Sequence, residues 1–520
     1  MDDIEKLVHG KSGIKRIVGL EVHESETEIF IQGDLGHISS VFKPNRFWIL
    51  ASTNIDGRFT RLQGDLHYKW GRQFDSLSSW KKMRSIWKNE DIYTIWNPEE
   101  AAMIKDGYTF FRDMKLSDLS VFSFDIETTG LDGRADDAQI LLISTTFRNS
   151  LGDNINKLFA YDNFESEGHM IEAFCDYVQD TNPTVIIGHN VISFDFLYLR
   201  DRADANGIQL FMGRDGSPVK LNDYSSNLRL DGTRALEYKN VSIYGRSICD
   251  TFFLVTSFDV SKVFESHALK PLVKQLGFEK ENRVYYDAGS IRNNYKNPIE
   301  WKKIKDYAIA DAEDSLKLFD HMAPLYFNMC PFVPKPFSAV LLSASGSKIN
   351  GMMVRAYLQQ KHSIPKADEI TSYQGALSWG KPGIFKNVFK ADCQSMYPSI
   401  IIQYEVFDNT KDPNAYLLQL VKIFRTKRLE YKKLAADTGN NYWKQMDTTM
   451  KGFLNSFYGF FGCSGLNFNS FECADFITAT GREILSTAIK WATSKDFKEI
   501  APEYFELHNK DNKDNDESCA

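Results

Sequence analysis

The sequence predicts an α/β protein of several domains, and three observations support this prediction. The chain has 520 residues, which exceeds the roughly 150 residues of an ordinary domain. Hydrophobic residues make up 43% and charged residues 25%, a usual mixture for chains that bury sizeable cores. Between residues 121 and 320, short apolar runs of strand length also alternate with longer stretches of helical pattern.

The first part of the chain, residues 1–115, reads as mixed strand and helix. Alternating polarity predicts strands over 26–33 and 47–53. The Asp56-Gly57 pair that follows is typical of a hairpin turn.

The next part, residues 116–325, has the texture of an α/β domain. Apolar runs at 121–127, 141–147 and 184–188 predict strands, and the pattern near 168–180 predicts a helix. A long helical stretch near 301–319 closes this domain, and three prolines between 331 and 336 mark a boundary.

Beyond that boundary the sequence predicts a helix and then a strand over 384–392. Three further helices are predicted over 416–435, 441–457 and 472–492. The last residues are polar and of low complexity, which predicts a disordered tail. The predicted domains are 1–115, 116–325, 326–415, 416–470 and 471–505, followed by the tail at 506–520.

Charge and cysteine usage restrict the class of protein. The net charge is −7, so any polyanion must be bound by local basic patches or through metal ions. None of the seven cysteines forms a C-x-x-C pair, which argues against a zinc module and fits a reducing compartment. The sequence has no apolar signal core and no apolar run of about 18 residues, so we expect no membrane contact and a cytoplasmic protein, in the host cytoplasm if the source is viral.

A candidate catalytic pair lies in the first strand of the α/β domain. Asp125 and Glu127 are two residues apart, so both side chains leave the same face of that strand. Two adjacent carboxylates repel each other unless one is protonated or a cation lies between them. Taken alone, a D-x-E pair is a weak signal, because surface pairing explains most such pairs.

Three more residues extend this pair. Asp195 follows a predicted strand at a turn into a helix, and Tyr307 and Asp311 share one helical face. A capping aspartate or a core tyrosine would explain each of them singly. Together, four carboxylates could hold two divalent ions around a phosphodiester, and oxygen ligands favour Mg²⁺ or Mn²⁺.

The order D-x-E, N-x-x-x-F-D and Y-x-x-x-D resembles the 3′→5′ exonucleases of family B DNA polymerases, in a phage-like or archaeal-like form. The stretches 245–250 and 266–277 also resemble that family. The resemblance implies a ribonuclease-H-like fold, with Tyr307 orienting the attacking water, and Asn190 and Phe194 contacting the 3′-terminal nucleotides. The metal ligands that it implies are Asp125, Glu127, Asp195 and Asp311.

A second set resembles the polymerase motifs of the same family. The string D-C-Q-S-M-Y-P-S-I at 392–400 resembles its motif A, with Met396 in place of leucine. The resemblance implies that Asp392 and the Cys393 carbonyl bind catalytic metal ions. Ser395 and the nearby backbone, including that of Met396, would meet the triphosphate, and Tyr397 would exclude a 2′-hydroxyl group.

Two helical segments resemble the fingers of these polymerases. Lys451, Asn455 and Tyr458 fall on one helical face, and Arg428 and Lys432 are one turn apart. A solvated basic helix is the plainer interpretation of residues 422–433. The resemblance implies that Arg428, Lys432, Lys451 and Asn455 bind nucleotide phosphates and that Tyr458 packs at the nascent base pair.

The family's later D-T-D motif and its thumb are not found, so the resemblance implies an incomplete palm with helical fingers. We expect a DNA polymerase with proofreading that uses dNTPs, primer-template DNA and two Mg²⁺ or Mn²⁺ ions per site. Polymerisation is expected only with a second polypeptide, and a sliding clamp is a candidate further partner. Two alternatives stay open: a fragment of a longer protein, and an exonuclease or DNA-binding subunit that does not polymerise.

Overall fold

The computed structural model describes residues 3–229, 235–259 and 261–502. It divides into two compact units, which are described separately. The first unit holds the chain up to residue 62 together with 70–344 and 358–361, and the second holds 63–69, 345–357 and the chain from 362 onward. The predicted domains 1–115 and 116–325 therefore lie mainly in one compact unit.

The amino-terminal part of the first unit is built on two antiparallel sheets. One has the order β1-β2-β3 and the other the order β5-β6-β4-β7. Their strands are β1 (Ile17–Val22), β2 (Glu26–Gln32), β3 (Ile38–Pro44), β4 (Phe47–Ala51), β5 (Thr60–Arg61), β6 (Trp70–Phe74) and β7 (Ile92–Tyr93). The accompanying helices are α1 (Asp3–His9), α2 (Leu77–Ile86) and α3 (Pro98–Asp106).

One sequence prediction in this part is wrong. The Asp56-Gly57 pair does not close a hairpin, because β4 pairs with β6 and β7, while β5 pairs with β6. The apolar strand β4 is buried along its whole length, so it takes the interior position between two other strands. The predicted strands at 26–33 and 47–53 are confirmed as β2 and β4.

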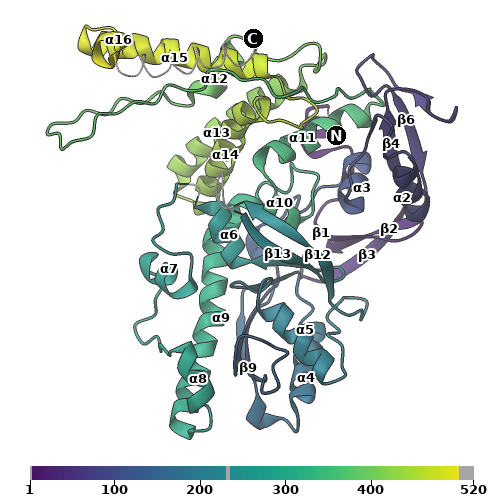
Figure 1. Cartoon of the computed structure of the whole chain (residues 1–520), viewed down its shortest axis with the longest axis vertical. Coiled ribbons are helices and arrows are strands. Elements are labelled where there is room, and N and C mark those ends of the chain that lie inside the picture. Colours follow the sequence, from purple (N-terminus) through teal and green to yellow (C-terminus); the bar gives the residue numbers. More distant parts are fainter. Residues whose placement is uncertain (1–2, 230–234, 260, 503–520) are drawn as a thin grey trace, which may run out of the picture. The chain divides into compact units, whose positions relative to one another are not determined.

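The first unit also contains a mixed five-stranded sheet, of which Figure 1 labels the strand β9. Its order is β10-β9-β8-β11-β14; β8 pairs antiparallel with β9 and parallel with β11. The strands are β8 (Val121–Thr128), β9 (Ile140–Arg148), β10 (Asn154–Ala160), β11 (Val185–Gly188) and β14 (Ser247–Asp250). A separate antiparallel pair consists of β12 (Lys220–Arg229) and β13 (Ala235–Ser242).

Helices accompany this sheet. They are α4 (Glu167–Thr181), α5 (Asp195–Ala205), α6 (Thr251–Phe258), α7 (Leu269–Gln275), α8 (Ala288–Asn294), α9 (Pro298–Phe327) and α10 (Phe337–Leu342), with short 3₁₀ turns at Leu116–Asp118 and Tyr161–Asn163. The helices pack against the sheet or, in the case of α7, against the helix α9. The predicted strands at 121–127, 141–147 and 184–188 and the predicted helices near 168–180 and 301–319 are confirmed.

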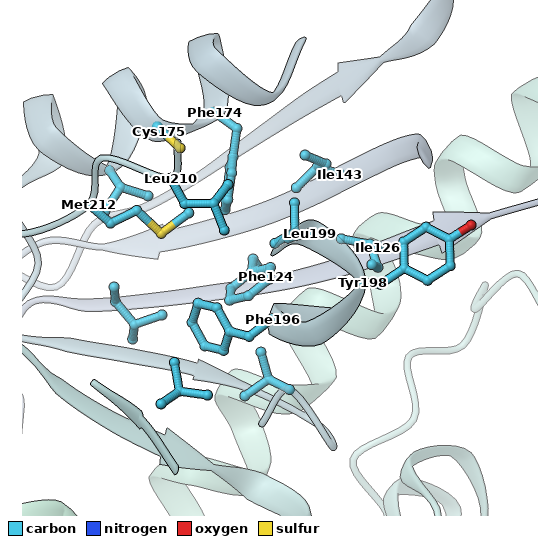
Figure 2. Close-up of a cluster of buried hydrophobic side chains, with 14 of the residues drawn as sticks. Phe124, Ile126, Ile143, Phe174, Cys175, Phe196, Tyr198, Leu199, Leu210 and Met212 are labelled. Atoms are coloured by element: carbon cyan, nitrogen blue, oxygen red, sulfur yellow. The ribbon is translucent and has the colours of Figure 1, made fainter. Parts of the chain in front are cut away.

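The period of two in β8 separates its core residues from its acidic ones. Phe122, Phe124 and Ile126 are buried in the hydrophobic core, together with Phe174 of α4 and Phe196 of α5. Figure 2 shows Phe124, Ile126 and Phe196 within this cluster. Because successive side chains of a strand point to opposite faces, Asp125 and Glu127 leave the other face of β8.

That other face of β8 is covered by the long helix α9. The helix begins where the sequence gives a strong start signal: Asn297 caps it with its side chain and Pro298 occupies its first position. Tyr307 and Asp311 are one turn apart and buried. The helix therefore brings its phenol and carboxylate to the face of β8 that bears the two acidic residues.

The second unit consists of helices and irregular segments in its described part. Its helices are α11 (Ser345–Gln359), α12 (Met396–Gln403), α13 (Tyr416–Thr438), α14 (Asn441–Phe461), α15 (Phe471–Thr493) and α16 (Phe497–Ile500). The last residue pair of α11 belongs to the first unit. The predicted helices at 416–435, 441–457 and 472–492 are confirmed as α13, α14 and α15.

The strand predicted over 384–392 is wrong. Residues 384–392 have no regular secondary structure, and Ile384, Val388 and Phe389 are exposed. A strand is stable only when its backbone groups pair with another strand. Among the described residues of the second unit there is no such partner, which accounts for the difference.

No helix within the described ranges is both long and apolar enough to cross a membrane. The predicted tail at 506–520 lies outside the described residues.

Candidate active site

Three of the predicted acidic residues come together between β8 and α9. One carboxylate oxygen from each of Asp125, Glu127 and Asp311 lies within 4.8 Å of the other two. Glu127 and Asp311 are buried, and Asp125 is half-buried. Within the described chain this is the acidic group with the spacing of a metal site, and its oxygen donors fit Mg²⁺ or Mn²⁺ better than a soft metal ion.

The fourth predicted carboxylate, Asp195, lies beside this group and also binds the backbone. It is the first residue of α5 and is buried. Its Oδ1 accepts a hydrogen bond of 3.1 Å from the backbone N–H of Ile126, between the two acidic residues of β8. This bond joins the start of α5 to the strand and fixes Asp195 next to Asp125 and Glu127.

The pKa values of these groups indicate strong mutual repulsion. Burial, with the neighbouring charges of Glu127, Asp195 and Asp311, raises the pKa of Asp125 well above its ordinary range. Burial raises the pKa of Glu127 to about 8 and that of Asp195 to about 7. A buried group of carboxylates that resists ionisation is stabilised by a divalent cation, which replaces the lost solvation.

Tyr307 lies at the edge of the carboxylate group and is in contact with a lysine. Its hydroxyl group accepts a hydrogen bond from Nζ of Lys270, at the start of α7. The same Nζ lies 3.8 Å from Oδ2 of Asp311. Burial raises the pKa of Tyr307, and the nearby carboxylates raise it further, so the phenol stays protonated.

An arginine contacts Asp311 from the other side. The Arg283 side chain is 2% exposed, and its guanidinium donates to Asp311 at 2.6 Å and to Asp314 at 2.7 Å. Asp311 is thus held between two cations, which offset part of the charge that burial makes unfavourable. Sequence reasoning missed both Lys270 and Arg283.

The loop that carries the N-x-x-x-F-D motif, from Asn190 to Asp195, is held by a further buried carboxylate, that of Asp250. It accepts hydrogen bonds of 2.9 Å from the backbone N–H groups of Asn190 and Ile192. Asn190 has a φ of 68°, in the left-handed region that non-glycine residues rarely adopt. The hydrogen bond from its N–H to Asp250 stabilises this backbone conformation. Phe194 is half-buried against the hydrophobic core, with its ring 5.7 Å from that of Tyr198.

The residues that resemble the polymerase motifs are only partly brought together. Asp392 and Cys393 are exposed in a segment without regular structure. Lys432, Lys451 and Asn455 are also exposed, on α13 and α14. The predicted metal-binding residues of this set therefore lie in open, irregular chain, whereas the predicted phosphate-binding residues lie on two packed helices.

Arg428 links the start of α12 to both of those helices. Its guanidinium donates to the hydroxyl oxygen of Ser395 at 2.6 Å and to Oδ1 of Asp447 at 3.1 Å. Ser395 has a left-handed backbone and precedes Met396, the first residue of α12. Asp447, on α14, is another residue that sequence reasoning did not single out.

Two of the predicted aromatic residues meet in the second unit. The ring centroids of Tyr397 and Tyr458 are 4.4 Å apart. Residues 373–376 have the sequence Y-Q-G-A. Tyr373 forms a hydrogen bond with Tyr458, and the α15 residue Arg482 donates to the carbonyl oxygens of Gln374 and Gly375 at 2.5 and 2.6 Å. The Y-Q-G-A segment is thereby fastened to α15 and to the Tyr458 face of α14.

Comparison with known proteins gives two matches to family models. Residues 78–270 match the exonuclease domain of DNA polymerase family B, and residues 405–517 match a model of DNA polymerase family B. The first match includes Asp125, Glu127 and Asp195, and ends before Tyr307 and Asp311. The second includes the α13 and α14 residues and begins after Asp392.

Similar whole proteins are archaeal DNA polymerases. The chain is 24% identical over 406 residues to a DNA polymerase of Pyrococcus glycovorans, covering 71% of this chain and 50% of that protein. It is 25% identical over 412 residues to one of Archaeoglobus fulgidus, covering 74% of this chain and 49% of that protein. The chain thus spans about half the length of these relatives.

The fold has a solved counterpart. The structure of the family B DNA polymerase from the hyperthermophilic archaeon Pyrobaculum calidifontis matches with a TM-score of 0.74 at 19% sequence identity. The match covers 92% of this chain and 72% of that one.

Proposed function

Since the chain belongs to DNA polymerase family B, with that family's exonuclease domain and part of its polymerase domain, we propose that it removes nucleotides from the 3′ end of DNA as the proofreading part of primed synthesis. The observation that supports this most directly is the oxygen group of Asp125, Glu127 and Asp311. Three carboxylates at this spacing serve no evident structural purpose, because burial and mutual repulsion disfavour their charged forms.

In the proposed reaction the scissile phosphate lies against the carboxylate group. Asp125, Glu127 and Asp311 would hold Mg²⁺ or Mn²⁺, with Asp195 as the adjacent fourth ligand. Bound metal ions would lower the pKa of the attacking water and offset the charge on the leaving 3′ oxygen. Tyr307 stays protonated, so its hydroxyl can orient that water without competing for its proton.

Asn190 and Phe194 would receive the terminal nucleotides. The backbone of Asn190 is fixed through Asp250, and the half-buried ring of Phe194 offers one face for a base. The Asp195 bond to β8 ties this loop to the carboxylates, so the base and the phosphate would be held by one rigid piece of chain.

For polymerisation we propose that Arg428, Lys432, Lys451 and Asn455 bind the phosphates of an incoming dNTP. Tyr397 and Tyr458 would pack against the sugar and the nascent pair, with Asp392 as one metal ligand. A single palm carboxylate cannot hold two Mg²⁺ ions unaided. We therefore propose that synthesis requires a further carboxylate from outside residues 1–520, together with strands that pair with the segment at 384–392.

A second candidate function is an exonuclease that does not polymerise. It is favoured by the exposed position of Asp392 and by the irregular structure around it. The two candidates differ in one respect: only the polymerase requires the cationic residues of α13 and α14.

The test is a primer-template assay on the purified chain in Mg²⁺, with and without dNTPs. We expect a 5′-labelled primer to be shortened in both conditions and extended in neither. Extension by residues 1–520 alone would contradict the need for a further carboxylate. A primer that stays at full length with Mg²⁺ and with Mn²⁺ would contradict the exonuclease assignment.

A further inference from the structure

Lys270 lies at the carboxylate group, yet neither the sequence patterns nor the comparisons assign it a role. It is the second residue of the short helix α7, and its side chain is 32% exposed. Its Nζ is in contact with three groups at once: the hydroxyl of Tyr307, the ring of Tyr307 at 4.2 Å from the centroid, and the Asp311 carboxylate at 3.8 Å. A solvated lysine would have no reason to adopt such a position.

The shortest of these contacts is the one to the Tyr307 hydroxyl. At 3.8 Å the Asp311 oxygen is beyond hydrogen-bond distance of Nζ, and Arg283 already donates to Oδ1 of Asp311 at 2.6 Å. Both cations lower the pKa of Asp311, but only Arg283 forms a hydrogen bond with its carboxylate. The position of Lys270 is explained better by the tyrosine, whose ring face and oxygen it contacts together.

An ammonium group can only donate hydrogen bonds, so it fixes how the phenol uses its own proton. Lys270 occupies an acceptor position on the Tyr307 oxygen, and the phenol in turn donates to Asp311. Without Lys270 the hydroxyl could rotate, and its remaining lone pair would no longer point in one fixed direction for the attacking water. With Lys270 present, Lys270 donates to Tyr307 and Tyr307 donates to Asp311. The phenol hydroxyl is then held toward the carboxylate group.

We propose that Lys270 is a positioning residue that fixes the Tyr307 hydroxyl for the exonuclease reaction. This inference rests on the proposed function. Lys270 forms no bond to substrate and transfers no proton. It acts through Tyr307, and its loss therefore removes only what the ordered tyrosine contributes.

A double-mutant cycle tests this directly, with 5′-labelled single-stranded DNA and Mg²⁺. Lys270→Met keeps the length of the side chain and removes its charge, and we expect it to lower kcat about tenfold with little change in KM. Tyr307→Phe should lower kcat by at least as much. In the Tyr307→Phe background, Lys270→Met should have less than about a twofold further effect, because its target is already gone.

The matched control is Lys274→Met, one turn further along the same helix. Lys274 is exposed, so this variant makes the same charge change on α7 away from the carboxylates. It should keep wild-type kcat. Equal losses in both lysine variants, or full multiplication of the Lys270→Met and Tyr307→Phe effects, would overturn the proposal.

Binding of the same DNA in EDTA provides a readout that does not depend on catalysis. A positioning role leaves the Kd within about twofold of wild type, and leaves its salt dependence unchanged. A weaker Kd with a flatter salt dependence would overturn the proposal, because it would place the ammonium on a phosphate. If the double variant Asp125→Ala with Glu127→Ala also degraded DNA at the wild-type rate, the proposed function itself would be wrong. If that double variant lost activity but Lys270→Met did not, the proposed function would stand and only the role proposed for Lys270 would be wrong.

Discussion

The Arg428 guanidinium donates to the carboxylate of Asp447 at 3.1 Å and so joins the two long helices α13 and α14 of the second unit. Both side chains are partly buried, at 14% and 27% exposed. The carboxylate is thus the immediate counter-charge of a residue that we propose to bind nucleotide phosphates.

Replacing Asp447 by asparagine should tighten nucleotide binding. The substituted side chain would still offer an amide oxygen to Arg428, but without a negative charge near the phosphates. We expect the Kd for Mg²⁺·dNTP to fall about three- to fivefold at low salt, with a smaller effect at high salt. Equilibrium titration of the chain with a fluorescent dNTP measures this. Asp437→Asn, an exposed site on α13, is the control, and an equal gain there would contradict a local effect.

Removing the carboxylate pair of β8 should abolish the exonuclease. Asp125→Ala with Glu127→Ala deletes two of the three grouped oxygen ligands, and we expect at least about a 10³-fold loss of primer shortening. Binding of Mn²⁺, followed by calorimetry, should be lost as well. The metal-free double variant should unfold at the same or a higher temperature than wild type, because two mutually repelling acids, one buried and one half-buried, are gone. Degradation at the wild-type rate would sink the assignment.

Asp250 should also affect the exonuclease reaction, because it holds the loop that carries Asn190. Asp250→Asn replaces an acceptor of backbone N–H groups by a side chain that can turn an N–H toward them. We expect about a tenfold or larger loss of exonuclease kcat through misplacement of Asn190. Asp412→Asn is the matched control, since Asp412 is also buried and also accepts from two backbone N–H groups, in the second unit. A similar loss in that control would indicate general destabilisation.

The stability of the chain should report the ionisation of Asp250. Burial raises the pKa of Asp250 from 3.8 to about 6. A carboxyl group with a raised pKa in the folded state stabilises the fold while it is protonated and loses that contribution as pH rises. Relative to Asp250→Asn, the free energy of unfolding of wild type should therefore fall by roughly 3 kcal/mol between about pH 4 and pH 6 and level off above. Denaturant unfolding at several pH values checks this, and parallel curves for the two proteins would contradict it.

Local patterns were sufficient to predict much of the geometry of the proposed exonuclease site. The spacing of two along β8 and of four along α9 placed Asp125, Glu127, Tyr307 and Asp311 on the correct faces, because these periods are properties of the backbone itself. That β8 and α9 would face each other came only from the resemblance, since the two elements are far apart in the sequence.

The residues that sequence reasoning missed depend on long-range packing. Lys270 and Arg283 lie in short or irregular segments whose positions are set by α9, and Asp447 looks like any polar residue of a helix. The strand expected at 384–392 failed for the same reason, since an apolar run becomes a strand only where another strand is present to pair with it.

That unpaired run has a practical consequence for anyone who handles the protein. Its exposed backbone, with Phe385, Lys386, Phe389 and Lys390 in reach of solvent, is the kind of chain that trypsin and chymotrypsin cut first. A brief digestion should release an amino-terminal piece of the chain that retains all of Asp125, Glu127, Asp195, Tyr307 and Asp311. The proposed nuclease activity should thus survive a cut that separates these residues from the helices α12 to α16, and a preparation that has aged into two bands should still degrade primers.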